Sequence, residues 1–218
     1  MTRGVRLVPI PGVFRPISDS WLLARVVRDE VGRVGAGSRV LDVCTGSGVV
    51  GVTAARAGAD VTAIDVSCRA VAAAWLNARI NRVRVRPRRG NLLEPVAGEQ
   101  FDVIASNPPY VPAESDTLPS RGPQRAWDAG RDGRVLLDRL IDGAPERLKP
   151  GGALLVVHSD LIGADRTLER MAAAGLEPDV AASERGPLGP LMRDRARRGL
   201  VAAGRDEEEV LVLRGRRR

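Results

Sequence analysis

Four consecutive residues, Asn107-Pro108-Pro109-Tyr110, follow an apolar stretch that ends at Ser106. An amide or exocyclic base nitrogen is a poor nucleophile, because its lone pair is delocalised, and it must be held by acceptors for its two N–H groups. The Asn107 side-chain oxygen and the Pro108 carbonyl can accept these hydrogen bonds, and proline has no N–H and a fixed φ, which turns its carbonyl out of a sheet ladder. Tyr110 offers a planar face to a planar group. The motif predicts an acceptor site for a planar nitrogen, and the alternative is a plain proline turn after a strand.

A glycine-containing segment upstream, Asp42 to Gly51, has the pattern of a ligand-binding loop between a strand and a helix. Gly46 and Gly48 let the backbone turn sharply and approach a ligand that a Cβ would block. The helix that follows offers N–H groups without intrahelical partners. Asp65 ends the next expected strand, where an acidic residue binds ribose hydroxyls in nucleotide-binding folds. Without this context the loop could equally be a tight turn.

Two cofactor classes share this layout, and Asp42 distinguishes them. The glycines at 46, 48 and 51 satisfy the GxGxxG spacing of dinucleotide-binding folds. A carboxylate directly before the loop would repel a pyrophosphate, but it suits a ligand that carries an ammonium and a sulfonium group. The sequence therefore favours S-adenosylmethionine over a dinucleotide. Its methyl group is already electrophilic, so the protein need only align donor and acceptor, and positioning alone can contribute about 7–11 kcal/mol.

The rest of the chain predicts the elements that position these residues. Strand and helix signals alternate along 218 residues, which predicts an α/β fold with a mainly parallel sheet in one domain, 1–218. Residues 1–35 should be an extended segment followed by a helix capped by Ser18 or Asp19. Strands are expected at 39–43, 61–65, 83–86, 101–106, 153–158, 176–183 and 208–213, and helices at 48–57, 67–80, 134–148 and 160–174.

Two segments fall outside this alternation. Residues 107–130 form a long loop rich in proline and glycine, and loops of this length in a compact domain are usually functional. Residues 186–204 form an arginine-rich insertion for which the sequence predicts no particular structure. The sequence contains one histidine, His158. It is interpreted as a structural residue at a strand end, because methyl transfer from a sulfonium needs no catalytic base.

Composition excludes several classes of protein. Hydrophobic residues make up 44 %, which argues against disorder, and no apolar run reaches the roughly 18 residues of a membrane span. The N-terminus has no signal-peptide pattern, so we expect a cytoplasmic protein without membrane contact. Cys44 and Cys68 resemble neither a disulfide framework nor a zinc site, so no metal is expected.

The net charge of +7 comes almost wholly from arginine, since Lys149 is the only lysine. We attribute this bias to a GC-rich gene more than to a nucleic-acid surface, although a basic balance in general favours acidic partners. The two densest clusters are Arg82–Arg89 and Arg214–Arg218, and the second is expected to be a solvated, frayed end.

Taken together, these segments resemble the HemK-type protein glutamine methyltransferases, most of all their short branch without an N-terminal helical domain. Residues 14–20 resemble the family's aromatic-x-Pro-x-x-Asp-Ser/Thr segment, and residues 125–133 resemble a stretch that follows its NPPY motif. The resemblance implies a Rossmann-like class I methyltransferase fold. Such a fold has a seven-stranded, mostly parallel sheet with one antiparallel strand and helices on both faces.

The resemblance also implies roles for single residues. At the cofactor it places Ser20, Asp42, Cys44, Gly46, Asp65, Asn91, Leu92 and Asn107. At the substrate it places Phe14, Asn107, Pro108, Pro109 and Tyr110, with Asn107, Pro108 and Tyr110 taking part in catalysis. Two positions depart from the family pattern. Asn91 stands where Asp is common, and Cys44 replaces a usual glycine, so only its backbone contact carries over.

The family's usual substrate is the glutamine of the Gly-Gly-Gln motif of a translation release factor, and some short-branch members use a small zinc-binding activator protein. The resemblance therefore implies N5-methylation of a protein glutamine. Adenine-N6 methylation of RNA or DNA is a less favoured alternative, for which only Arg82–Arg89 and residues 186–204 could form a basic surface. Methylation of lysine or of a small molecule, and a scaffold that binds cofactor without catalysis, are further alternatives.

Overall fold

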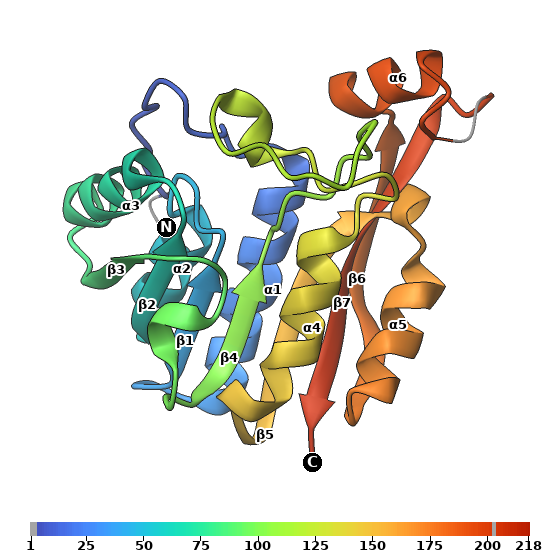
Figure 1. The fold of residues 1–218 in the computed structure, drawn as a ribbon. Coiled ribbons are helices and arrows are strands. Elements are labelled where there is room, and N and C mark those ends of the chain that lie inside the picture. The colour runs from blue at the N-terminus through green and yellow to red at the C-terminus, as the bar shows by residue number, and fades with distance from the viewer. Residues whose placement is uncertain (1–3, 202–203) are drawn as a thin grey trace.

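The computed structural model describes residues 4–201 and 204–218, and within these ranges a seven-stranded sheet forms the centre of the molecule (Figure 1). The strands are β1 Arg39–Val43, β2 Asp60–Asp65, β3 Val85–Arg89, β4 Phe101–Ser106, β5 Leu148–Ser159, β6 Leu176–Pro187 and β7 Glu207–Arg217. The α-helices of the described ranges are α1 Ser18–Val34, α2 Val49–Arg56, α3 Cys68–Ile80, α4 Val135–Arg147, α5 Ala164–Ala173 and α6 Pro190–Arg197. Short 3-10 turns occupy Glu94–Val96, Pro123–Ala126 and Asp160–Ile162.

The strand order is β3-β2-β1-β4-β5-β7-β6. Neighbours from β3 to β5 are parallel, whereas β7 runs antiparallel to both β5 and β6. This confirms the predicted mostly parallel sheet with one antiparallel strand. The chain reverses its direction of travel across the sheet between β1 and β4, and open α/β sheets bind ligands at the carboxyl ends of their strands at such a point.

The core lies on both faces of the sheet, because alternate residues of a strand point to opposite sides. Val40 and Val103 pack with the helices α1 and α2, whereas Leu41 and Ile104 pack with α4. Both faces of the central strands are therefore covered, which explains their continuous apolar sequences. None of the helices in the described part of the chain is long and apolar enough to cross a membrane.

Several element boundaries differ from the sequence prediction. The third strand begins at Val85, not at residue 83, because Arg82 adopts a left-handed φ of 58° and the Val83 N–H bonds back to Ala78. Helix α1 begins at Ser18 with Ile17 in the capping position, and no side chain caps it. The proposed caps, Ser18 and Asp19, were wrong because both residues lie inside the helix, and the buried Asp19 belongs to the site described below.

Later in the chain, the predicted helix 134–148 ends at Arg147, and residues 150–152 lie inside β5. The predicted helix 160–174 is divided at Gly163, whose positive φ separates a 3-10 turn from α5. The insertion at 186–204 contains α6 and extends the β6 and β7 hairpin.

The expectation of a frayed C-terminus was wrong. Strand β7 continues to Arg217, and ion pairs hold its basic residues in place. The Arg216 guanidinium lies 2.9 Å from Glu30, and Arg218 lies 2.5 Å from Glu177. Helix α1 and strand β6 thus supply the carboxylates that fix the end of the chain.

Candidate active site

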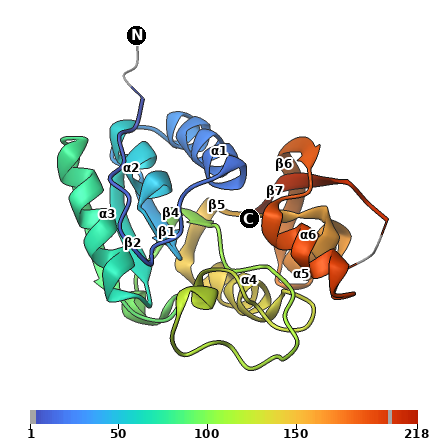
Figure 2. The ribbon, with the colours of Figure 1, turned by 90° about the horizontal axis from the view of Figure 1, so that it is seen from above.

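A cavity of about 850 Å³ lies at the carboxyl edge of the sheet. From above, the N-terminal segment and the 107–130 loop lie over this edge, with α6 beside them (Figure 2). We name two parts of the cavity by their lining residues. The glycine-loop half is lined by the loop after β1 together with Asp65 and Asn91, and the Asn107 half by Asn107–Tyr110, Trp127 and Leu191.

Asp42 holds the glycine loop together from the end of β1. Its Oδ2 accepts hydrogen bonds from the Thr45 hydroxyl at 2.5 Å and from the Gly51 N–H at 2.9 Å. The side chain lines the cavity but is only 1 % exposed. Burial raises the pKa of Asp42 to about 7, although these two hydrogen bonds oppose the shift. A positive ligand group beside it would favour the ionised form.

Asp65 anchors the same loop from the end of β2. One carboxylate oxygen accepts from the Gly46 N–H at 3.0 Å and the other from the Ser67 N–H at 2.9 Å. Burial raises its pKa above the ordinary value, while these backbone hydrogen bonds lower it. Each carboxylate oxygen can accept more than one hydrogen bond, so Asp65 retains capacity for ligand hydroxyls.

The two glycines of the loop serve different purposes. Gly46 has a φ of +53°, and a Cβ there would meet only the Cys44 carbonyl, at 4.0 Å, so the side-chain position opens on the cavity. Gly48 has a φ of +82°, and its Cβ would lie 2.8 Å from Ala74 of α3. Among the described residues, those lining the cavity do not include Gly48. Close packing on α3 is thus a structural reason for a glycine at this position, and the ligand contact of Gly48 stays a prediction.

Cys44 also occupies a left-handed conformation, with φ of 58°. This backbone geometry favours glycine, which accounts for the glycine that the related family usually has at this position. Burial raises the pKa of the Cys44 thiol well above its ordinary value, so the side chain stays neutral. Nearby, Asn91 lines the cavity and donates to Glu94 at 2.9 Å, and Leu92 lines it as well.

In the Asn107 half, the amide of Asn107 is oriented by α1. Its Nδ2 donates to the Ser20 hydroxyl at 3.0 Å, so the side-chain oxygen is the group left to accept from a ligand. Pro108, Pro109 and Tyr110 line the cavity beside it. The structure thus brings together the motif and the N-terminal segment, which also contributes Phe14 to the cavity wall.

Asp19 connects these groups, and the sequence analysis did not assign it to the site. Its Oδ2 accepts from the Tyr110 hydroxyl at 3.0 Å, and its Oδ1 accepts from the Ser20 hydroxyl at 3.0 Å. Burial and the Asp19 charge hold the pKa of Tyr110 well above its usual value, so the phenol stays a donor. Asp19 lies within residues 14–20, the segment that resembles the family pattern, but the sequence analysis interpreted it as a possible helix cap and assigned it no role in the site.

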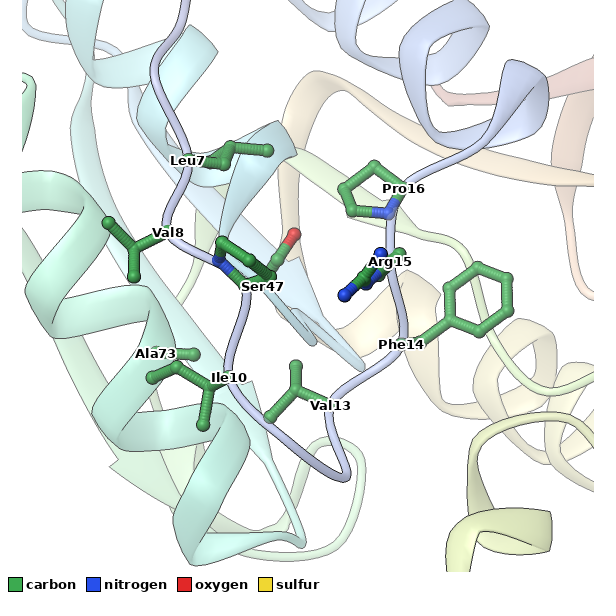
Figure 3. Close-up of a pocket in the computed structure, with 10 residues that line it drawn as sticks. Leu7, Val8, Ile10, Val13, Phe14, Arg15, Pro16, Ser47 and Ala73 are labelled. Atoms are coloured by element: carbon green, nitrogen blue, oxygen red, sulfur yellow. The ribbon is translucent and has the colours of Figure 1, made fainter.

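The N-terminal segment is attached to the glycine loop through α3. Asn77 is fully buried, accepts from the Val8 N–H at 2.8 Å and donates to the Ser47 carbonyl at 2.9 Å. A smaller cavity of about 230 Å³ lies between the segment, Ser47 and Ala73 (Figure 3). Phe14 points away from α3 in this view and lines both cavities.

His158, as predicted, is a structural residue. It is fully buried, and its ring nitrogens contact the Thr167 hydroxyl at 2.9 Å and the Ser159 carbonyl at 2.8 Å. Burial lowers the pKa of His158 to about 4. The ring is therefore neutral near pH 7, and it does not belong to the described residues that line the cavity.

Comparison with known proteins identifies relatives over most of the chain. A family model described as the methyltransferase small domain matches residues 10–119. A Methanocaldococcus jannaschii protein with the name "Putative protein N5-glutamine methyltransferase" is 33 % identical over 87 % of this chain and 93 % of its own length. A release factor glutamine methyltransferase of Bordetella pertussis is 40 % identical over 74 % of this chain and 63 % of its own length. The chain thus spans less than two thirds of that longer enzyme.

Solved structures share the fold at lower identity. The Mtq2–Trm112 complex of E. cuniculi, which is described as responsible for methylation of the eRF1 translation termination factor, matches with a TM-score of 0.64 at 21 % identity. This match covers 95 % of this chain and 99 % of that one. A T. thermophilus 16S rRNA N2 G1207 methyltransferase in complex with AdoMet and guanosine matches with a TM-score of 0.66 at 20 % identity, over 96 % of this chain and 46 % of that one.

The residues of the cavity fit S-adenosylmethionine as the cofactor. Gly46 opens on the cavity where a side chain would fill it, and Asp65 can accept from hydroxyls. Asp42 can ionise beside a positive group. With the match of the family model, the cofactor predicted from the sequence is confirmed. The chain belongs to the methyltransferase small domain family, and its relatives include proteins named as protein glutamine methyltransferases of the HemK type.

Proposed function

We propose that this protein methylates the glutamine of a Gly-Gly-Gln motif in a translation release factor, at the side-chain nitrogen N5. The observation that carries this proposal is the oriented amide of Asn107. Because Ser20 fixes its nitrogen at 3.0 Å, its oxygen is presented as an acceptor next to the Pro108 carbonyl. A primary amide has two N–H groups, and these two acceptors are complementary to them.

The two acceptors would act on the glutamine nitrogen by position and by charge. When bound, S-adenosylmethionine supplies an electrophilic methyl group. Asn107 and Pro108 would hold the acceptor nitrogen and favour the positive charge that develops there while its bond to the methyl carbon forms and the sulfur–methyl bond breaks. The cofactor's sulfur would leave as a neutral thioether, and the surplus N–H proton of the methylated amide would pass to solvent. Tyr110 stays protonated and donates to Asp19, so it positions the site and does not take a proton.

The charges around the motif support a protein acceptor over a nucleic acid. Asp19 and Glu208 both line the cavity next to Tyr110, and their carboxylates would repel backbone phosphates. In the basic cluster at 82–89, Arg86 pairs with Asp60 at 2.8 Å and Arg88 pairs with Glu99 at 2.5 Å. These charges are already balanced within the protein, which weakens the case for a phosphate-binding surface.

We extend the proposal to partners and organisation. The B. pertussis relative is named for release factors, and the E. cuniculi neighbour is a complex with Trm112. On this basis we propose a release factor as substrate in the cytoplasm, and a small zinc-binding protein as activator. We also propose that residues 1–218 act as one methyltransferase domain, since the cavity is lined by segments from both ends of the sequence.

The test is transfer of a labelled methyl group to a purified release factor, with and without a small activator. We expect label in the wild-type factor and none after its Gly-Gly-Gln glutamine is changed to alanine. Label that persists in the altered factor would refute the proposed site of methylation. Transfer to RNA or DNA instead, falling steeply as salt is raised, would support the alternative acceptor.

A further inference from the structure

The insertion at 186–204 places a helix against the acceptor site. Helix α6 links β6 to β7 at the edge of the sheet where the 107–130 loop lies (Figures 1 and 2). Pro190 and Leu191, at the start of this helix, line the cavity together with Trp127. The family resemblance covers the cofactor loop and the Asn107-Pro108-Pro109-Tyr110 motif, and it assigns no function to this helix.

Two polar contacts fix α6 at its two ends. The Glu208 carboxylate, on β7, accepts from the Gly189 N–H at 2.7 Å. Towards the other end, the Arg195 guanidinium lies 2.7 Å from Asp128, and the two side chains are only 10 % and 15 % exposed. An ion pair so little exposed to water is costly to break, because the remaining charge loses its partner in a poorly hydrated place.

Apolar packing connects the same helix to the motif. Met192 and Leu188 are buried together with Val111, the residue that follows Tyr110. Leu191, Tyr110 and Trp127 are partly buried against this cluster. Asp128, the partner of Arg195, is adjacent to Trp127, whose carbonyl accepts from the Val111 N–H at 2.8 Å. The position of α6 is thus coupled to the backbone beside the acceptor motif.

We propose that α6 is the substrate-specificity element of this enzyme. Leu191 forms an apolar wall that contacts the protein segment flanking the methylated glutamine, and the Arg195–Asp128 ion pair positions that wall. The inference rests on the proposed function, since it takes a protein segment as the acceptor. Leu191 is a contact residue, whereas Arg195 is a positioning residue that acts through the helix.

The experiment measures steady-state methylation of a release factor by wild type, Leu191→Ser and Arg195→Met. For both variants we expect KM for the release factor to rise about tenfold with kcat within about twofold, since a lost apolar contact in a binding pocket weakens binding by this order. Affinity for S-adenosylmethionine, measured by calorimetry, should be unchanged. Arg197→Ala, on the exposed side of the same helix, is the matched control and should equal wild type.

A charge exchange separates positioning from simple loss of structure. Arg195→Asp combined with Asp128→Arg restores the ion pair in reverse, and we expect it to reverse most of the rise in KM seen in Arg195→Met. If Arg195→Met does not fold, Leu191→Ser decides alone. An unchanged KM in folded Leu191→Ser overturns the proposal, as does a loss of cofactor affinity equal to the rise in KM. Wild-type enzyme that leaves the release factor unmethylated refutes the proposed function instead.

Discussion

The two halves of the cavity are built in different ways. In the glycine-loop half, the hydrogen bonds of the two carboxylates span at most 19 positions: Asp42 reaches residues three and nine positions away, and Asp65 reaches Ser67 and Gly46. In the Asn107 half, Tyr110 and Asp19 are 91 positions apart, and Arg195 and Asp128 are 67 apart. A half made of local contacts keeps its chemistry when distant segments change. A half assembled from distant segments can change its acceptor while the cofactor loop stays intact.

The largest effect should follow from breaking the Asn107 half at its centre. Asn107→Ala removes an acceptor that acts where charge develops, and loss of one such group costs about 100- to 1000-fold in kcat. The glycine-loop half does not depend on this side chain, so affinity for S-adenosylmethionine should stay within a few-fold of wild type. Single-turnover methyl transfer and calorimetry measure the two quantities separately.

Ser20→Ala should affect the same step as Asn107→Ala, but less strongly. It leaves the Asn107 side chain in place but removes the hydroxyl that fixes its amide nitrogen. One hydrogen bond contributes about 1 kcal/mol, so kcat should fall several-fold, well short of Asn107→Ala. Equal kcat in wild type and Asn107→Ala would remove Asn107 from the chemistry and undo the distinction between the halves.

The same distinction explains what the sequence could predict. The loop after β1 and Asp65 were recognisable because strand, glycines and carboxylate follow one another within a single β-α-β unit. The mainly parallel character of the sheet was predictable from alternating signals for the same reason, whereas its strand order was not predicted. Asp19 was not assigned to the site, because its partner Tyr110 lies 91 residues away, and no local pattern reports such a contact. The spacing of Gly48 matched a ligand loop, but the sequence could not show that a Cβ at this position would also collide with Ala74.

An intermediate effect should follow from removing the carboxylate of Asp19. It accepts hydrogen bonds from both Tyr110 and Ser20, and hydrogen bonds to a charged group contribute about 1.5–3 kcal/mol. Asp19→Ala should therefore lower kcat by about 10- to 100-fold. Tyr110→Phe removes only one of these bonds and keeps the ring, so its loss should be smaller. If kcat fell further in Tyr110→Phe than in Asp19→Ala, the phenol hydroxyl would act on the substrate directly.

An effect smaller than that of Asp19→Ala should come from the glycine-loop half, as a pH dependence of cofactor affinity. Burial raises the pKa of Asp42 to about 7 in the protein without cofactor, and a cationic ligand binds the ionised carboxylate more tightly. Affinity for S-adenosylmethionine should therefore rise by up to about tenfold between pH 6 and 8, because the ionised fraction rises by that factor across a pKa of 7. Asp42→Asn should flatten this rise, and calorimetry at pH 6, 7 and 8 measures it.

Titration of Asp42 should change the stability of the fold in the opposite direction to cofactor affinity. The folded pKa of Asp42 lies above its unfolded value of 3.8, so the folded protein binds the proton more tightly than the unfolded chain. The contribution of Asp42 to the free energy of unfolding is thus fully present below pH 4 and is lost as pH rises through 7. Relative to Asp42→Asn, wild type should become less stable to urea from pH 5 to 8 while it binds cofactor more tightly. If the free energy of unfolding and the affinity for S-adenosylmethionine both rose with pH, the pKa of Asp42 would not be raised. The hydrogen bonds from Thr45 and Gly51 would then be made to an ionised carboxylate.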